Sequence, residues 1–185
     1  MRWWCFLVGV FALFLLPETA WGQSFVGRNV PFKPVDRLLT RLNSQRAQLG
    51  KPPLQSRGEA HITVVTPPEL DRLAQHLPLA EVQEIAQSAG LARAHFRVSG
   101  IGKAAALIPA RDGAEAAETY FLVVDAPELA KIRERIQREF VARGGAANAF
   151  DPGHYQPHIT IGFTHRDLHE DDGVTKGAES IYFKR

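Results

Sequence analysis

Apolar side chains follow two different periodicities along this chain of 185 residues. Residues 34–49 carry apolar side chains at intervals of three and four, which predicts an amphipathic helix that ends before Gly50. The same spacing predicts helices over residues 69–77, 79–88 and 128–142. Apolar runs rich in β-branched residues predict strands at residues 61–64, 95–108, 119–124, 158–161 and 180–183. Within residues 95–108, Gly100 and Gly102 mark an expected turn.

The order of these elements predicts the α+β class. Helix, strand, helices and strands come first, and strand, helix and strand follow, which gives two α+β halves. Because no long linker separates them, we expect one bilobal domain of two pseudo-symmetric lobes, with antiparallel sheets flanking a central cleft. We expect an extended lead-in (residues 23–33) and the first helix to make up residues 23–57, and the domain itself to span residues 58–185.

The first 22 residues have the pattern of a secretory signal peptide. Arg2 supplies a positive charge, residues 3–16 are apolar, and small residues precede an expected cleavage point between Gly22 and Gln23. The apolar run is shorter than the ~20 residues needed to span a bilayer. We therefore expect export to the periplasm or the medium, with no membrane association after cleavage.

Composition adds two constraints. The single Cys and all three Trp lie within the expected signal segment, so residues 23–185 can form no disulfide and depend on packing. The formal net charge of +2 does not suggest a groove for duplex nucleic acid, where clustered Lys and Arg are expected. A small phosphorylated nucleotide or an RNA end is the better match, and we expect a monomer.

Two short copies of one pattern carry the candidate chemistry, His61-Ile62-Thr63-Val64 and His158-Ile159-Thr160-Ile161. Because side chains alternate across a strand, the His and Thr of each copy share one face and the aliphatic residues share the other. One copy alone has little meaning, since Thr is common in strands. Two copies facing one cleft would combine two acid/base groups with two hydroxyl donors, which suits phosphate-ester chemistry without a metal.

Paired motifs of this kind, one in each half of a chain of this size, resemble the 2H phosphoesterase superfamily. That superfamily includes 2′-5′ RNA ligase-like proteins and 2′,3′-cyclic nucleotide phosphodiesterases. The resemblance runs from about residue 58 to residue 185 and is most specific over residues 155–163, Tyr-Gln-Pro-His-Ile-Thr-Ile-Gly-Phe. Residues 166–174 are similar to the Swiss army knife branch, which is found in RNA-repair-like proteins. The resemblance implies a bilobal 2H fold and hydrolysis of 2′,3′-cyclic phosphates without a cofactor.

In this reaction His61 and His158 would be the catalytic acid and base, in an order that the sequence leaves open. One imidazole would take a proton from water and the other would protonate the departing ribose oxygen. Thr63 and Thr160 would bind the phosphate by donating hydrogen bonds to its non-bridging oxygens.

Three further side chains are candidates for substrate binding. Tyr155 precedes the second motif and could stack on a base, although a core aromatic is the more common role. Lys103 follows Gly100-Ile101-Gly102 and could contact phosphate, although the spacing is not that of a phosphate loop. His169 follows the second motif closely and could reach the cleft.

Two alternatives stay open. The same scaffold could bind nucleotides or RNA ends without turnover, because a fold does not fix a function. Residues 167–172 hold the densest cluster of metal-ligand side chains, which would suit a metal-dependent phosphohydrolase. Their spacing does not match an EF-hand loop, so we assign no metal ligand.

Overall fold

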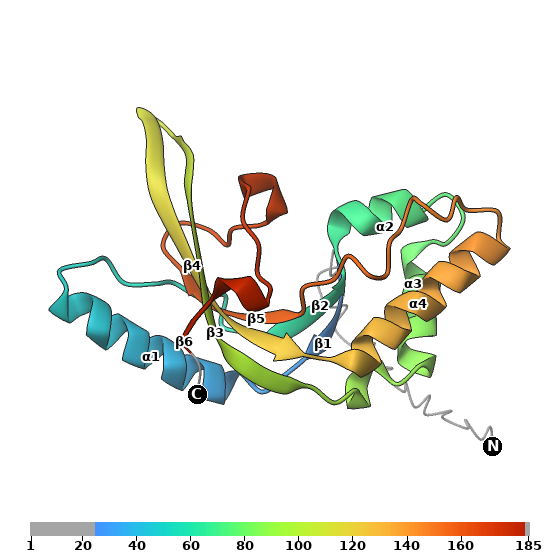
Figure 1. Cartoon of the computed structure of the whole chain (residues 1–185), viewed down its shortest axis with the longest axis horizontal. Coiled ribbons are helices and arrows are strands. Elements are labelled where there is room, and N and C mark those ends of the chain that lie inside the picture. The colour runs from blue at the N-terminus through green and yellow to red at the C-terminus, as the bar shows by residue number, and fades with distance from the viewer. Residues whose placement is uncertain (1–24, 184–185) are drawn as a thin grey trace, which may run out of the picture.

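The computed structural model describes residues 25–183, and the expected signal peptide lies outside the described residues. The elements follow in the order β1 (Val26–Asn29), α1 (Phe32–Gln48), β2 (His61–Val65), α2 (Pro67–Leu73), α3 (Leu79–Ser88), β3 (Arg97–Ala110), β4 (Gly113–Asp125), α4 (Pro127–Ala142), β5 (His158–Phe163) and β6 (Ile181–Phe183) (Figure 1). Short 3-10 helices cover Leu91–Arg93, Glu170–Asp172 and Ala178–Ser180. No helix of the described part is both long and apolar enough to cross a membrane.

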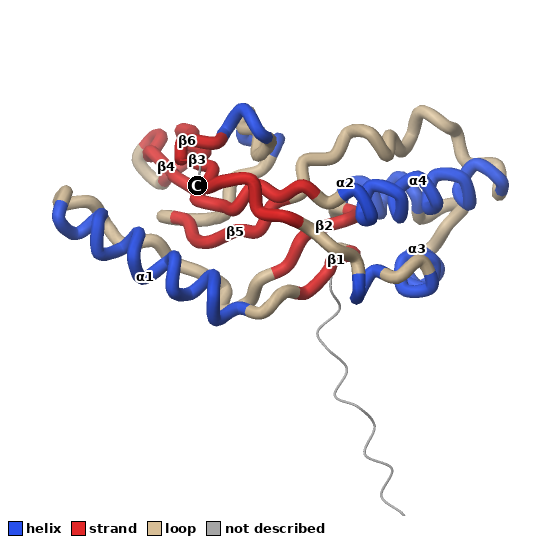
Figure 2. Tube along the Cα trace, turned by 60° about the horizontal axis from the view of Figure 1, so that its bottom comes forward, coloured by secondary structure: helices blue, strands red, loops and turns tan. Residues whose placement is uncertain are grey.

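The strands form two antiparallel sheets, which confirms the predicted α+β class. One sheet pairs β1 with β2, and the other has the order β5-β4-β3-β6. The two sheets meet where β2 contacts β5. Figure 2 shows α1 at one end of the strands and α2, α3 and α4 together at the other. The sheets differ in size, so the two halves are less alike than the two motifs they carry.

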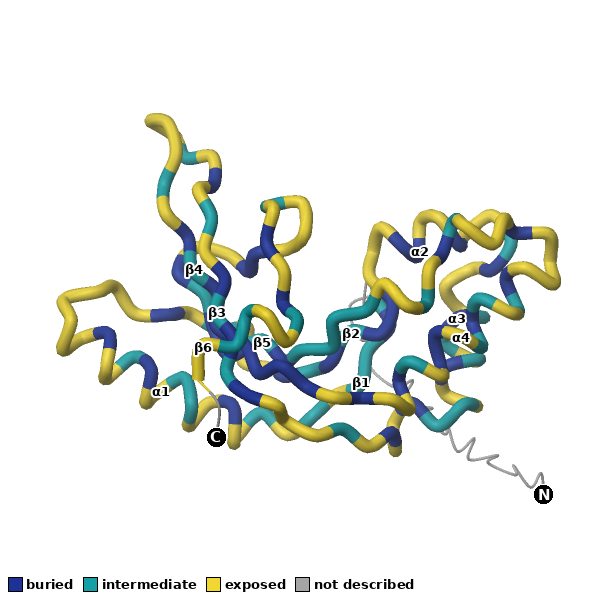
Figure 3. The backbone as a smooth tube through the Cα atoms, in the orientation of Figure 1, coloured by how far each residue is buried: buried dark blue, intermediate teal, exposed yellow. Residues whose placement is uncertain are grey.

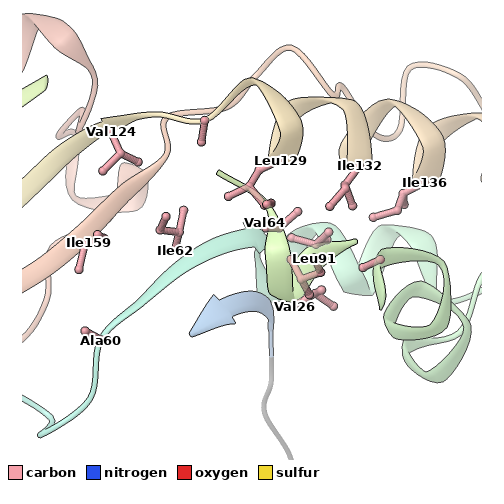
Figure 4. Close-up of a cluster of buried hydrophobic side chains, with 14 of the residues drawn as sticks. Val26, Ala60, Ile62, Val64, Leu91, Val124, Leu129, Ile132, Ile136 and Ile159 are labelled. Atoms are coloured by element: carbon pink, nitrogen blue, oxygen red, sulfur yellow. The ribbon is translucent and has the colours of Figure 1, made fainter. Parts of the chain in front are cut away.

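The two faces of the larger sheet support different clusters of apolar side chains. Along β4, Tyr120 and Leu122 enter the main core, whereas Phe121 and Val123 enter a smaller cluster. The main core fills the space between the strands and the helices, with Ile62 of β2 lying between Ile159 of β5 and Leu129 of α4 (Figure 4). The smaller cluster is covered by the segment after β5. The sheet is therefore buried on both faces near its centre, while the far end of the β3–β4 hairpin is exposed (Figure 3).

The β3–β4 hairpin departs from the expected pattern, because β3 is continuous through Gly100 and Gly102 and the chain turns only before Gly113. These two glycines make room for their neighbours. A Cβ on Gly102 would lie 2.3 Å from the ring of Phe121, and one on Gly100 would lie 2.8 Å from the side chain of Ile181. Gly113 has a φ of +128°, which favours glycine. The strand predicted at 119–124 consequently begins at Gly113.

Two other boundaries differ from expectation. The lead-in predicted as extended contains β1, which pairs with β2 and so belongs to the sheet. The helix expected at 69–77 begins at Pro67 and ends at Leu73. Thr66 is the N-cap residue of this helix, and its backbone N–H donates a hydrogen bond to the Glu69 carboxylate at 2.8 Å.

A buried arginine of α4 ties these elements together. Arg133, whose side chain is 1% exposed, donates two hydrogen bonds to the carboxylate of Glu69 in α2, at 2.7 and 3.1 Å. It also donates to the Val64 carbonyl of β2 at 2.7 Å. Its remaining hydrogen bonds reach the carbonyls of Pro152, Asp151 and His154. Burial acts to raise the pKa of Glu69, but the charge and hydrogen bonds of Arg133 together with the hydrogen bonds from Thr66 lower it, so the carboxylate stays ionised.

We expect Arg133→Met to destabilise the fold by about 3–5 kcal/mol, because it leaves the Glu69 carboxylate buried without a partner. Urea denaturation measures this change. Arg97→Met is the matched control, since the Arg97–Asp125 pair is exposed and its loss should change stability by ~1 kcal/mol or less. Equal midpoints for the two variants would contradict a central role for Arg133.

Candidate functional site

The pleat of β2 and β5 places both motifs as their sequence pattern requires. In β2, Ile62 and Val64 are 0% and 1% exposed, whereas His61 and Thr63 are half-buried. In β5, the aliphatic residues are again buried in the main core and His158 and Thr160 are half-buried on the other face. Because β2 lies beside β5, the structure brings the two histidine strands together.

His158 is held in one orientation by the residues around it. Its Nδ1 lies 2.7 Å from the carbonyl oxygen of Gln156, so Nδ1 carries the proton and donates it. The edge of the ring meets Phe121, with ring centroids 5.7 Å apart. The side chain of Gln156 in turn accepts a hydrogen bond from the backbone N–H of Lys176 at 2.7 Å. The Nε2 of neutral His158 therefore has a free lone pair.

His61 has a different environment. Phe25 stacks on its ring at 4.4 Å, and the Glu59 carboxylate lies 3.7 Å from Nδ1. Burial lowers the pKa of His61 below its usual value. Glu59 opposes this shift and Arg57 adds to it. The Asp167 carboxylate also acts to raise the pKa of His61, so β2 and β5 share one electrostatic environment.

A buried ion pair that sequence reasoning missed lies beside the second motif. Lys176 Nζ donates to Asp167 Oδ1 at 2.8 Å, and these side chains are only 5% and 9% exposed. The hydroxyl of Thr160 donates to the other oxygen of Asp167 at 3.0 Å. Asp167 was expected only as part of an acidic cluster, and Lys176 had no sequence signal, because nothing in the sequence places it near β5.

This ion pair affects His158. Burial lowers the pKa of His158 well below its usual value, and the nearby Lys176 ammonium lowers it further. The Gln156 carbonyl and the Asp167 carboxylate act in the opposite direction but do not cancel the effect. Burial also works against ionisation of Asp167, but Lys176 outweighs it and keeps the pKa of this carboxyl low. At neutral pH the site therefore contains a neutral His158 beside an ionised pair.

A small pocket of about 30 Å³ opens next to these groups. His61 of β2 and Thr160 of β5 line it, together with Asp167, Glu59 and Arg57. Arg57 is the only Lys or Arg among the residues that line this pocket, and it makes no ion pair within residues 25–183. Sequence reasoning missed Arg57, which belongs to the irregular segment before β2. The pocket thus holds the Arg57 guanidinium, which could pair with an anion, beside the carboxylates of Glu59 and Asp167.

The three side chains that the sequence suggested for substrate binding lie in different places. Burial lowers the pKa of His169, and the nearby Lys176 ammonium lowers it further. His169 therefore borders the site. Tyr155 packs its ring on Arg133, 4.9 Å from the guanidinium, and joins the main core. Lys103 pairs with Glu118 at 2.5 Å. It lies opposite Tyr120 in the sheet, and therefore on the face away from His158.

The acidic residues 167–172 are largely engaged with cations. Arg166 pairs with Asp172 at 2.5 Å, His154 pairs with Glu170 at 2.9 Å, and Asp167 pairs with Lys176. Over residues 25–183, no group of three or more His, Cys, Asp or Glu side chains is arranged to hold a metal ion. The geometry therefore gives no support to a metal centre in this segment.

Comparison with known protein families identifies the family of this chain. A family model described as "Swiss Army Knife, 2H phosphoesterase domain" matches residues 29–169. The match covers most of the chain, so the protein belongs to the 2H phosphoesterases and, within them, to the Swiss Army Knife branch. Phosphoesterase activity is the general activity of this family. No curated protein and no solved structure matches the chain.

We expect His158 to titrate below the usual histidine value of about 6.5 and to move upward in Lys176→Met, because the ammonium disfavours the imidazolium. Titration of the histidine ring protons by NMR measures both values. His154 is the internal control: Glu170 raises its pKa, and Lys176 is not among the groups that affect it. A His158 value unchanged by the substitution would contradict the assigned environment.

Proposed function

We propose that this protein is a metal-independent phosphodiesterase that hydrolyses 2′,3′-cyclic phosphates of nucleotides or RNA ends. The observation that carries the proposal is that the strands of His61 and His158 lie side by side, next to a pocket that His61, Thr160 and Arg57 line. A cyclic phosphodiester carries a single negative charge, which matches the charge that Arg57 provides. The strained five-membered ring lowers the barrier, so acid/base catalysis by two imidazoles suffices.

The surroundings of the two histidines divide their roles. His158 is the base, because its Nδ1 proton is donated to Gln156 and burial beside Lys176 favours its neutral form. His61 is the acid, because Glu59 and Asp167 partly oppose the lowering of its pKa by burial, whereas the pKa of His158 falls to about 3. In hydrolysis His158 Nε2 takes a proton from the attacking water, and His61 gives a proton to the departing ribose oxygen.

Charge on the phosphate is stabilised from the side of β2. Thr63 shares the face of His61, and its hydroxyl can donate to a non-bridging oxygen. Arg57 lines the pocket and can pair with the same phosphate. No metal is needed in this scheme, since protein groups supply the acid, the base and the positive charge.

We expect the chain to hydrolyse 2′,3′-cyclic AMP in EDTA, and His61→Ala and His158→Ala each to lower kcat by roughly 10²–10⁴-fold. Separation of nucleotide products by chromatography measures the rates. His95→Ala is the matched control, because the side chain of His95 is 89% exposed and far along the chain from both motifs. Full activity in both motif variants would exclude the two-histidine mechanism, and loss of wild-type activity in EDTA would exclude metal independence.

We expect the optimum of kcat/KM to lie below pH 6.5. The active form needs one imidazole protonated and the other neutral, so it is populated between the two pKa values of the free enzyme. Both values are lowered in the folded protein, which moves the optimum to the acidic side. An optimum above pH 7 in a pH–rate profile would contradict this assignment.

A further inference from the structure

The two threonines of the motifs have different hydrogen-bond environments. Thr160 donates its hydroxyl proton to Asp167 Oδ2 at 3.0 Å. The carboxylate is held by Lys176 through its other oxygen at 2.8 Å. Within residues 25–183, no comparable side-chain partner is found for Thr63. The symmetric role expected for the two hydroxyls does not follow from this arrangement.

A threonine hydroxyl has one proton and two lone pairs. While the proton of Thr160 is donated to an ionised carboxylate, only the lone pairs remain for a ligand. Asp167 and Lys176 are both buried, so releasing this proton would leave a buried carboxylate with fewer hydrogen bonds. Thr160 is therefore held as an acceptor on the wall of the pocket.

An acceptor beside a carboxylate suits a group that carries hydrogens better than it suits a phosphate oxygen. His158 is two residues earlier on the same face of β5, and its Nε2 is also an acceptor. Two acceptors side by side match the two hydrogens of one water molecule.

We propose that Thr160, held by Asp167 and Lys176, accepts a hydrogen bond from the attacking water while His158 removes the water's other proton. The new bond forms between the water oxygen and phosphorus, and the bond from phosphorus to one ribose oxygen breaks. That oxygen takes its proton from His61. The nucleophile thus enters from β5 and the leaving group departs toward β2, with Thr63 and Arg57 on the phosphate between them. Asp167 and Lys176 act as positioning residues.

Competition between water and methanol tests this inference, which rests on the proposed function. Methanol has one hydroxyl hydrogen, which His158 must take, so it gains nothing from Thr160. In Thr160→Val we expect hydrolysis of 2′,3′-cyclic AMP to fall about tenfold, the effect of one hydrogen bond, while methanolysis changes little. Chromatography of the nucleotide phosphate and its methyl ester gives the ratio of the two products.

Three variants make the comparison specific. Thr160→Ser keeps the hydroxyl and should keep the wild-type ratio. Thr63→Val removes a phosphate contact that both nucleophiles share, so both rates should fall together with the ratio unchanged. The double variant Asp167→Leu/Lys176→Met removes the ion pair as a unit, and its ratio should fall toward that of Thr160→Val. Circular dichroism melting curves confirm that each variant is folded.

The outcomes separate the two proposals. If Thr160→Val slows hydrolysis and methanolysis equally, as Thr63→Val should, Thr160 is a phosphate donor and the inference is overturned while the proposed function stands. A folded wild-type protein that produces neither product would overturn the proposed function and the inference with it.

Discussion

The ion pair between Arg133 and Glu69 holds the parts of this protein that carry the site. One guanidinium joins the start of α2, the end of β2 and the loop that leads into β5, and its contacts with α2 and β2 are fully buried. A buried arginine without these acceptors would be strongly destabilising, so the surrounding elements can pack in few other ways. The positions of both motif strands thus depend on a residue that belongs to neither of them.

Features set by short-range sequence patterns could be predicted. Helical spacing located α1, α3 and α4 closely, and β-branched alternation placed the histidines and threonines on the correct face. The β3–β4 hairpin was harder, because its strands are rich in Ala and Gly, whose small side chains give little periodicity. Gly100 and Gly102 suggested a turn because glycine is common in turns. In the structure, glycine is needed at these positions because side chains from neighbouring strands approach the backbone closely.

The site could be predicted only in part, for a related reason. The motif residues lie within regular strands, so local geometry fixes their orientation. Arg57 and Lys176 come from irregular segments, and only the folded chain brings them beside β2 and β5. The role of Asp167 was also hidden, because the sequence shows a dense acidic cluster and not its buried pairing with Lys176. Sequence therefore predicted how the motif side chains are placed, while the charged groups around them required the structure.

The placement of the two histidines in separate sheets has a consequence for how the protein acquires its activity. The first motif is near the start of the domain and the second comes after α4, so their meeting is among the long-range contacts of the fold. Such contacts close large loops, and the entropy of closing those loops slows folding. A chain that still lacks the segment from β5 onward has neither the second motif nor the Asp167–Lys176 pair. The proposed two-histidine catalysis therefore requires the completed domain, so turnover would report directly on its folding.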